Sequence, residues 1–227
     1  ISDLLFTTDQ GADANLLREG VPADRIHRVG NVMIDTLLKH RDAALARPTL
    51  EDLGVERRGY AVVTLHRPSN VDDADVFRGI AGALAHVAAQ VPVVFPVHPR
   101  TRNNMSRFGL DDVLSEARGF RLIEPAGYLD FLNLTANARL VLTDSGGIQE
   151  ESTILGVPCL TLRHNTERPV TIEHGTNRLV GNDPERIRAA ADAVLAGEVA
   201  TDRRPELWDG RSAERIATVL QEVYGAA

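Results

Sequence analysis

Short apolar runs alternate with amphipathic segments along almost the whole chain. The stretches "DLLFTT", "YAVVTL", "PVVFPV", "RLVLTD" and "PCLTL" have the length and apolar content of buried strands. Residues 73–90 instead repeat apolar side chains at helical spacing, with Val76, Ile80, Leu84 and Val87 on one face. This alternation of strands and helices predicts an α/β fold with a Rossmann-like parallel sheet flanked by helices.

The two ends of the chain differ from this central series. The chain opens without an initiator Met on "ISDLLFTT", which reads as a buried strand from its first residues. A fold that opens inside a core suggests the C-terminal part of a longer protein, and a complete protein cleaved from a tag is the alternative. Residues 47–58 have little apolar periodicity and are the candidate linker. The final helix is predicted to place five apolar residues on one face: Ala213, Ile216, Val219, Leu220 and Val223.

Charge and cysteine content narrow the class of protein. A net charge of −7 and a pI near 5.5 argue against nucleic acid and membranes as partners, so any anionic ligand needs local positive groups. No apolar run approaches the length of a membrane span. The single cysteine, Cys159, is predicted to be buried in a strand and favours a cytoplasmic location. No HExxH motif or pair of cysteines occurs, so no metal site is predicted.

Four polar segments follow predicted strands. They are "HRPSN" (66–70), "HPRTR" (98–102), "DSGG" (144–147) and "RHNTERP" (163–169). Ligands of parallel α/β sheets bind at the carboxyl ends of the strands, where loops lead into helices. We therefore expect the four segments to line one crevice.

The "DSGG" segment predicts an anion site. Unpaired N–H groups at a helix N-terminus carry the positive end of the helix dipole. Ser145 adds a hydroxyl group, and Gly146 and Gly147 have no side chain to block a ligand. Each glycine costs about 1 kcal/mol relative to alanine in a helix interior, which suggests a use for the bare backbone. A tight strand-to-helix turn capped by Ser145 is the alternative.

Glu151 lies four residues after Gly147 and is therefore on the same helix face. A carboxylate there can accept hydrogen bonds from the diol of a ribose, and an exposed helix charge is the alternative. Glu150 points elsewhere on the helix and is predicted to be an ordinary exposed charge.

Three further side chains are candidates for the crevice. Arg168 precedes Pro169, which restricts its backbone, and its guanidinium group is suited to phosphate oxygens. His66 and Arg67 directly follow a strand end, where catalytic and phosphate-binding groups often lie. A surface arginine and a loop-capping histidine are the alternatives. His98 and Arg100 make a weaker case of the same kind.

The segments "TLHRPSN", "VHPRT", "LTDSGGIQEES…LGVP" and "NTERPVTIEHGTNRLVG" closely resemble the non-hydrolysing UDP-N-acetylglucosamine 2-epimerases. The resemblance covers essentially the whole chain. It implies the glycosyltransferase-B architecture, in which two Rossmann-like domains enclose a nucleotide-sugar. Residues 1–46 would be the end of the N-terminal domain with its crossover helix, and 47–58 the linker. Residues 59–208 would form the UDP-binding C-terminal domain, and 209–227 a C-terminal helix.

The resemblance also implies an isomerase activity. Members of the family interconvert UDP-GlcNAc and UDP-ManNAc by eliminating UDP and adding it back after the proton at C2 returns to the other face. They use no redox cofactor, and none is predicted here. The family's acid–base carboxylates lie in the first domain, so this chain alone is expected to be inactive. A homodimer is expected for the full-length form.

Site roles follow from matching motif positions. The resemblance implies that residues 145–147 hold the diphosphate, with Arg168 and His66 beside it, and that His66 assists departure of UDP. Glu151 would bind the ribose hydroxyl groups, and Phe131 would lie near the uracil. A few charge-assisted hydrogen bonds, offset by the cost of association, predict binding of UDP to this chain with a Kd of ~1 mM.

The sequence is also compatible with three other functions. The same architecture serves glycosyltransferases, which need an acceptor, and hydrolysing epimerases, which release a free sugar. A non-catalytic UDP-binding module is a further alternative, because the family's catalytic carboxylates have no counterpart in this chain.

Overall fold

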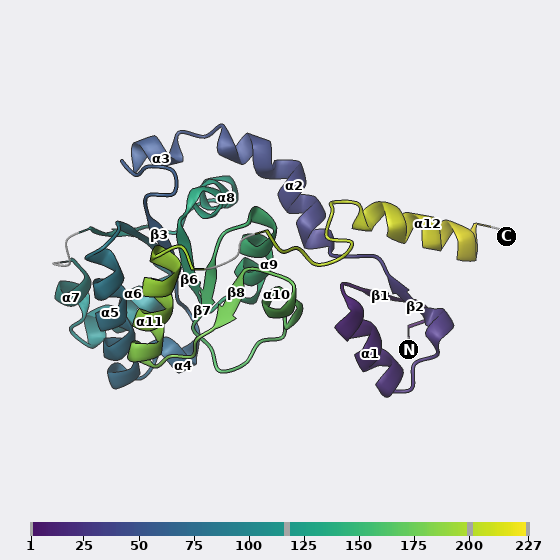
Figure 1. Ribbon diagram of the computed structural model, residues 1–227, viewed down its shortest axis with the longest axis horizontal. Helices are drawn as coiled ribbons and strands as arrows, with labels where there is room; N and C mark the ends of the chain where they lie inside the picture. The colour runs from purple at the N-terminus through teal and green to yellow at the C-terminus, as the bar shows by residue number, and fades with distance from the viewer. Residues whose placement is uncertain (1, 116–118, 199–201, 226–227) are drawn as a thin grey trace.

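The computed structural model describes residues 2–115, 119–198 and 202–225 as a six-stranded sheet with helices on both faces and a smaller two-stranded unit (Figure 1). The strands are β1 (Leu5–Thr7), β2 (Ile26–Arg28), β3 (Ala61–Thr64), β4 (Val93–Pro96), β5 (Phe120–Ile123), β6 (Leu140–Thr143), β7 (Cys159–Thr161) and β8 (Asn177–Leu179). The helices are α1 (Gln10–Arg18), α2 (Val32–Leu45), α3 (Thr49–Asp52), α4 (Pro68–Val71), α5 (Ala74–Ala88), α6 (Pro99–Arg107), α7 (Asp111–Ser115), α8 (Tyr128–Asn137), α9 (Gly146–Leu155), α10 (Val170–Glu173), α11 (Pro184–Leu195) and α12 (Ser212–Tyr224). The neighbouring strands pair in parallel, so the predicted α/β fold is confirmed.

The strand order is β5-β4-β3-β6-β7-β8, so the chain adds strands on one side of β3 first and on the other side afterwards. The chain runs from β3 outward to β5, then returns to β6 on the other side of β3 and continues to β8. Strands β3 and β6 pair from Ala61 with Leu140 to Thr64 with Thr143. Loops that leave such a pair at the carboxyl ends diverge, and the space between them is where ligands of open α/β sheets bind.

Two apolar cores cover the two faces of the sheet. Helices α5 and α11 pack together on one face, and α8 and α9 help to cover the other (Figure 1). In β3, β4, β6 and β7, successive residues enter the two cores in alternation, as the period of a strand requires. The helix predicted over residues 73–90 is α5. Of its four predicted inward positions, Ile80, Leu84 and Val87 are fully buried and Val76 is partly buried.

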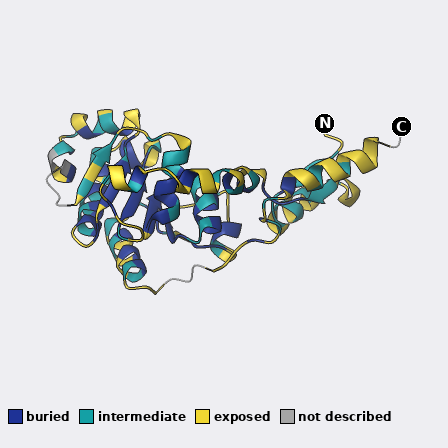
Figure 2. Ribbon diagram, turned by 90° about the horizontal axis from the view of Figure 1, so that it is seen from above, coloured by how far each residue is buried: buried dark blue, intermediate teal, exposed yellow. Residues whose placement is uncertain are grey.

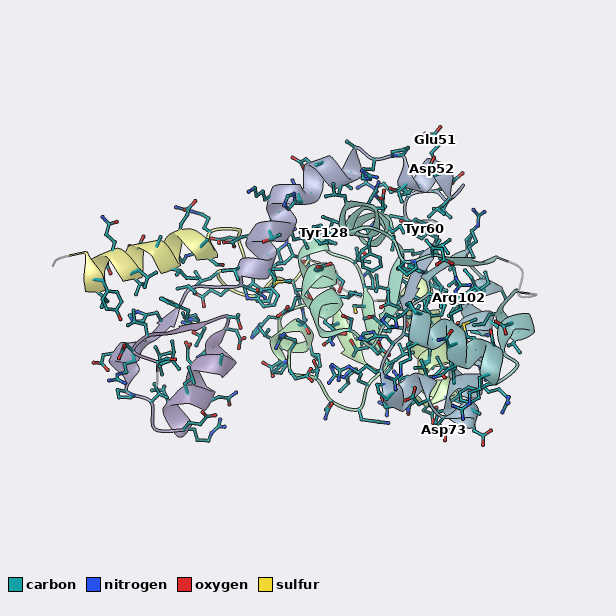
Figure 3. The ribbon with its side chains drawn as sticks, turned by 180° about the vertical axis from the view of Figure 1, so that it is seen from behind. Glu51, Asp52, Tyr60, Asp73, Arg102 and Tyr128 are labelled. Carbon is teal, nitrogen blue, oxygen red and sulfur yellow. The ribbon has the colours of Figure 1, made fainter. Side chains whose placement is uncertain are left out.

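Polar side chains and a glycine set the ends of several helices. Asp73 accepts hydrogen bonds from the first backbone N–H groups of α5, and Asp183 does the same for α11. Gly156 ends α9 with a φ of 64°, a left-handed conformation that favours glycine. Figure 3 shows Asp73 and the outer helix residues Glu51 and Asp52 at opposite ends of the main lobe.

The range 47–58, expected to be a linker, contains the short helix α3. Val55 is buried, and Leu50 and Leu53 pack against the same core cluster on the α8 side of the sheet. The segment therefore crosses the surface as a packed connection. The domain boundaries at 46, 58 and 208 stay predictions.

The strands β1 and β2 with α1 form a small unit beside the main sheet, and α12 extends next to it (Figure 1). The indole Nε1 of Trp208 donates to the backbone O of Thr8 at 2.9 Å. The carboxylate of Asp35, on α2, accepts from the backbone N of Ser212 at 3.1 Å. The first bond joins the N-terminal unit to the segment before α12, and the second joins the start of α12 to α2.

The final helix forms as predicted, but its apolar face is not buried by the described residues. Ile216 and Val219 are half-buried, whereas Leu220 and Val223 are exposed. Figure 2 shows that exposed residues dominate this end of the molecule. The helix predicted from the apolar spacing is confirmed, and the described residues leave part of its apolar face exposed.

Cys159 lies fully buried in β7, as predicted. Burial raises the pKa of its thiol to about 11. Among the described residues, no helix has the length and apolar character needed to cross a bilayer.

Candidate functional site

The carboxyl ends of β3 and β6 lie at a crevice with a largely apolar lining. The hydroxyl groups of Thr64 and Thr143, the last residues of the two strands, are hydrogen-bonded at 2.6 Å. A cavity of about 210 Å³ opens beside them. Its lining brings together three predicted site residues and one weaker candidate: His66, Phe131, Ser145 and His98.

The first turn of α9 presents bare backbone. Ser145 is the N-cap residue, and its own backbone N donates to the hydroxyl of Thr143 at 3.0 Å. A Cβ atom added to Gly146 or Gly147 would meet no heavy atom of the described residues within 4 Å. The open space beside both glycines leaves room for a ligand at the positive end of the helix dipole.

Asp144 precedes this turn and is completely buried. Its Oδ2 accepts from three donors: the backbone N of His66 (3.0 Å), the backbone N of Arg67 (2.9 Å) and Nδ2 of Asn70 (3.2 Å). Its Oδ1 lies 2.9 Å from Nδ1 of His66. Burial alone would raise the pKa of Asp144, but hydrogen bonds from the His66 ring and the two backbone amides together lower it. The residue therefore carries a buried negative charge that joins the two central loops.

The His66 side chain is 43% exposed at the cavity. Its pKa is raised, chiefly by the hydrogen bond to Asp144, while partial burial and the charge of Arg67 oppose the shift. The ring centroid of His98 lies 6.0 Å away. Because Nδ1 is engaged by the carboxylate, Nε2 is the ring nitrogen left to meet a ligand.

Arg67 bridges two of the predicted segments. Its Nε donates to the backbone O of Asp144 at 3.1 Å, and its Nη2 lies 3.8 Å from Oε1 of Glu167. Glu167 accepts from two nitrogens of the buried Arg163, at 2.7 and 2.8 Å, and these bonds lower the pKa of Glu167 to about 2. The "TERP" segment is therefore fixed to the loop that follows β3.

Arg168 is held by a residue whose environment was predicted wrongly. Its Nε lies 2.7 Å from Oε1 of Glu150, which was expected to be an exposed helix charge but is buried. Burial raises the pKa of Glu150, and the charge of Arg168 opposes that shift. The guanidinium group is 45% exposed and accessible to a ligand.

Glu151 is half-buried on α9. Burial, followed by the charge of Glu150, raises the pKa of Glu151 to about 7. Tyr128 at the start of α8 is near enough for the charge of Glu151 to contribute to its raised pKa, after burial. A carboxyl group with this pKa can both accept and donate hydrogen bonds near neutral pH.

Sequence reasoning missed several polar residues that build the site. Asp144 was recognised only as part of a turn, and Gln149 was given no role. Gln149 is fully buried, and its Oε1 accepts from Oγ1 of Thr166 at 2.6 Å and from Nδ2 of Asn177 at 3.1 Å. Arg100, a weak candidate, pairs with Asp72 instead of lining the cavity. Gln149 could have been found from the sequence, because a polar residue at an inward position of a helix indicates a buried hydrogen-bonding role.

Metal ligands do not gather anywhere in residues 2–115, 119–198 and 202–225. No three His, Cys, Asp or Glu side chains come together there in a way that could hold a metal ion.

The fold and the site define a class of protein. A parallel sheet with a central switch point, and a glycine-rich helix N-terminus that opens into a crevice there, are typical of Rossmann-like nucleotide-binding proteins. A sequence model of the UDP-N-acetylglucosamine 2-epimerases matches residues 1–221. The chain belongs to the UDP-N-acetylglucosamine 2-epimerase family.

Individual relatives agree with this assignment. The chain is 39% identical over 230 residues to the UDP-N-acetylglucosamine 2-epimerase of Methanocaldococcus jannaschii, covering 99% of this chain and 62% of that protein. The structure of the same organism's UDP-GlcNAc 2-epimerase, in complex with UDP-GlcNAc and UDP, superposes with a TM-score of 0.85 at 37% identity, over 97% of this chain and 61% of that one. A third relative, from Pseudomonas aeruginosa, is a UDP-2,3-diacetamido-2,3-dideoxy-D-glucuronate 2-epimerase, 36% identical over 98% of this chain and 61% of that protein. The chain thus spans about three fifths of the length of these relatives.

Proposed function

We propose that this chain is the UDP-binding part of a UDP-GlcNAc 2-epimerase of the non-hydrolysing type. The observation that carries the proposal is the open space beside Gly146 and Gly147, at the helix N-terminus next to His66. A diphosphate placed there would accept hydrogen bonds from backbone N–H groups and lie at the positive end of α9.

The proposed reaction needs a base at C2 of the sugar and stabilisation of the leaving diphosphate. A base takes the proton from C2 of the sugar while the C1–O bond breaks, and the electron pair of that bond goes to the β-phosphate oxygen of UDP. The intermediate is a 2-acetamidoglucal, and return of a proton to the other face of C2 followed by addition of UDP gives the epimer. This chain supplies stabilisation of the leaving diphosphate by the amides of Gly146 and Gly147, by the Ser145 hydroxyl and by His66, whereas the Ser145 amide is already bound to the Thr143 hydroxyl.

The remaining site residues receive roles from their positions. Phe131 lines the cavity and offers an apolar surface to the uracil ring. Glu151, half-buried on the same helix as the glycines, binds the ribose hydroxyl groups. Arg67 and Arg168, each held by a hydrogen bond or ion pair of its own, contribute positive charge near the diphosphate.

Isothermal titration of this chain with UDP tests the binding part of the proposal. We expect a Kd of ~1 mM for UDP and no measurable binding of uridine, because the diphosphate supplies the charge-assisted bonds. Equal affinity for UDP and uridine would contradict the proposed site. So would the absence of UDP binding at concentrations about 10-fold above this Kd.

The reaction itself is tested on the full-length protein. Incubation with UDP-GlcNAc alone should yield UDP-ManNAc, whereas this chain alone should yield none. A glycosyltransferase would need an acceptor, a hydrolysing epimerase would release free sugar, and a binding module would return the substrate unchanged. The rate with UDP-2,3-diacetamido-2,3-dideoxy-D-glucuronate should be compared with the rate with UDP-GlcNAc, since a relative of similar identity is named as the 2-epimerase of that sugar nucleotide. The homodimer and the cytoplasmic location expected from the sequence stay predictions.

A further inference from the structure

Asp144 is the residue on which the two central loops converge. We infer that Asp144 is a positioning residue that fixes the ring of His66, with the Nδ1–H bound to its carboxylate and Nε2 facing the cavity. The catalytic consequence of this arrangement rests on the proposed function. The arrangement itself can be tested without a substrate.

The hydrogen bonds of Asp144 leave its carboxylate little freedom to rotate. Oδ2 accepts from the backbone N atoms of His66 and Arg67 and from Nδ2 of Asn70, at 2.9–3.2 Å. Asn70 is itself buried and also donates to the backbone O of Leu162 at 2.8 Å. With Oδ2 held by three donors, Oδ1 is aimed at Nδ1 of His66.

This geometry selects one tautomer of the histidine. An ionised carboxylate can only accept hydrogen bonds, so the Nδ1 atom 2.9 Å from Oδ1 must carry a proton. In the neutral ring Nε2 is then without a proton, and in the charged ring Nε2 becomes the donor that faces the cavity. The neighbouring carboxylate favours the charged ring.

A structural role alone does not account for the choice of residue. Burying a carboxylate is unfavourable unless it is paired, and within the described residues His66 is the only side chain that forms an ion pair with Asp144. The buried charge is therefore directed at a titratable group that lines the cavity.

The other charged groups around the pair act in both directions. The charge of Arg67 disfavours the imidazolium form, and His98 lies on the cavity side at 6.0 Å between ring centroids. Arg163 also faces Asp144, but it is neutralised by Glu167. The direct hydrogen bond to Asp144 outweighs the charge of Arg67, so His66 keeps its proton to higher pH than a free histidine. A charged Nε2–H is suited to donate to a departing diphosphate.

The replacement Asp144→Asn gives a sharp test. One amide oxygen can keep the three donors of the Oδ2 position, and the amide NH2 group must then face Nδ1 of His66. Nδ1 becomes an acceptor, the proton moves to Nε2, and the charge that favoured the imidazolium is lost. We therefore expect the tautomer of His66 to invert and its pKa to fall, because the carboxylate charge that favoured the imidazolium is gone.

Long-range 1H–15N NMR spectra of histidine-labelled protein measure both quantities. In the unsubstituted chain at high pH, His66 should show a protonated Nδ1, and a protonated Nε2 there would overturn the inference even if the variant fails to fold. Asp192→Asn is the matched control, because Asp192 pairs with Nε2 of His86 at 2.8 Å on the outside of α5. It should leave the signals of His66 unchanged. An Asp144→Asn variant that folds but keeps the original tautomer and pKa would also contradict the inference.

Kinetics of the full-length enzyme separate positioning from plain stabilisation. If Asp144 acts through His66, Asp144→Asn should lower kcat ~10-fold or more with little change in KM. The same replacement in a His66→Asn background should then cost nothing further. Additive losses would overturn the inference. Absence of UDP binding or epimerisation, with the expected tautomer present, would contradict the proposed function and leave the placement of His66 standing.

Discussion

Arg168 Nε lies 2.7 Å from Oε1 of the buried Glu150, so the arginine of the "TERP" segment is bound to the helix that begins at the glycine turn. The resemblance to the UDP-N-acetylglucosamine 2-epimerases implies that the motifs of both residues bind the same substrate. The contact joins the two motifs, because Glu150 on α9 orients the arginine.

Replacing Arg168 with alanine is expected to lower the free energy of unfolding by about 1 kcal/mol at pH 7, a modest value because the guanidinium is half exposed. Loss of the arginine raises the already high pKa of Glu150 further. The carboxyl group is then protonated as the pH falls, so the destabilisation should shrink at pH 5. Urea unfolding at both pH values measures this. Arg211→Ala, which removes an exposed pair with Glu214 on α12, is the control and should change stability little. An equal loss at both pH values would contradict the expectation.

Adding a methyl group at Gly146 or Gly147 should separate binding from folding. The Cβ atom enters open space, and alanine is a better helix former by about 1 kcal/mol in a helix interior, so stability should be unchanged or higher. UDP must approach through the same space, and its Kd should rise ~10-fold or more, as measured by isothermal titration. Gly82→Ala within α5 is the matched control, since its Cβ would make only an ordinary contact with Arg188 at 3.5 Å. Unchanged affinity in both turn variants would refute the anion site.

The raised pKa of Glu151 predicts a pH dependence of stability. The folded-state pKa of about 7 lies above the ordinary value of 4.5, so the folded protein binds more protons than the unfolded chain between these values. The contribution of Glu151 to the free energy of unfolding therefore falls as the pH rises from 4.5 to 7. Glu151→Gln should be more stable than the unsubstituted chain at pH 8, by about 1–2 kcal/mol, and similar to it at pH 4.5. Thermal unfolding across this range checks the result. A variant less stable at pH 8 would show that the carboxylate is held by partners that favour its charge.

The buried Gln149 should be needed for the "TERP" segment to hold its shape. Gln149→Leu leaves Oγ1 of the half-buried Thr166 and Nδ2 of the buried Asn177 without this acceptor, and the loss of a partner by a buried group costs about 1–3 kcal/mol. We expect a clear loss of stability together with weaker UDP binding. Gln221→Leu, at an exposed position on α12, is the control and should leave both unchanged. Weaker stability with full UDP affinity would mean that the segment does not depend on this residue.

Apolar periodicity and capping signals predicted the sheet and most helices because both follow from local chemistry. The spacing of Ile80, Leu84 and Val87 predicts α5, and Asp183 before Pro184 predicts the start of α11. Burial of the last helix could not be predicted in the same way, because it depends on whether another element covers Leu220 and Val223.

The residues of the candidate site also differ in whether local sequence could predict them. His66 and Ser145 could be placed at one cavity because both follow strands of one parallel sheet. The burial of Glu150 and the hydrogen bonds of the Asp144 carboxylate depend on segments far apart in the sequence. No spacing within a single segment contains that information.

The pairing of Thr64 with Thr143 also determines how the crevice can vary. His66 and Asp144 each lie within two residues of that rung, so a slip of one residue between β3 and β6 would separate the ring from its carboxylate by the rise of a strand residue, about 3.3 Å. Changes in the outer strands β5 and β8 impose no such penalty. Sequence drift should therefore be absorbed at the margins of the sheet, while the length of the two innermost turns stays constant.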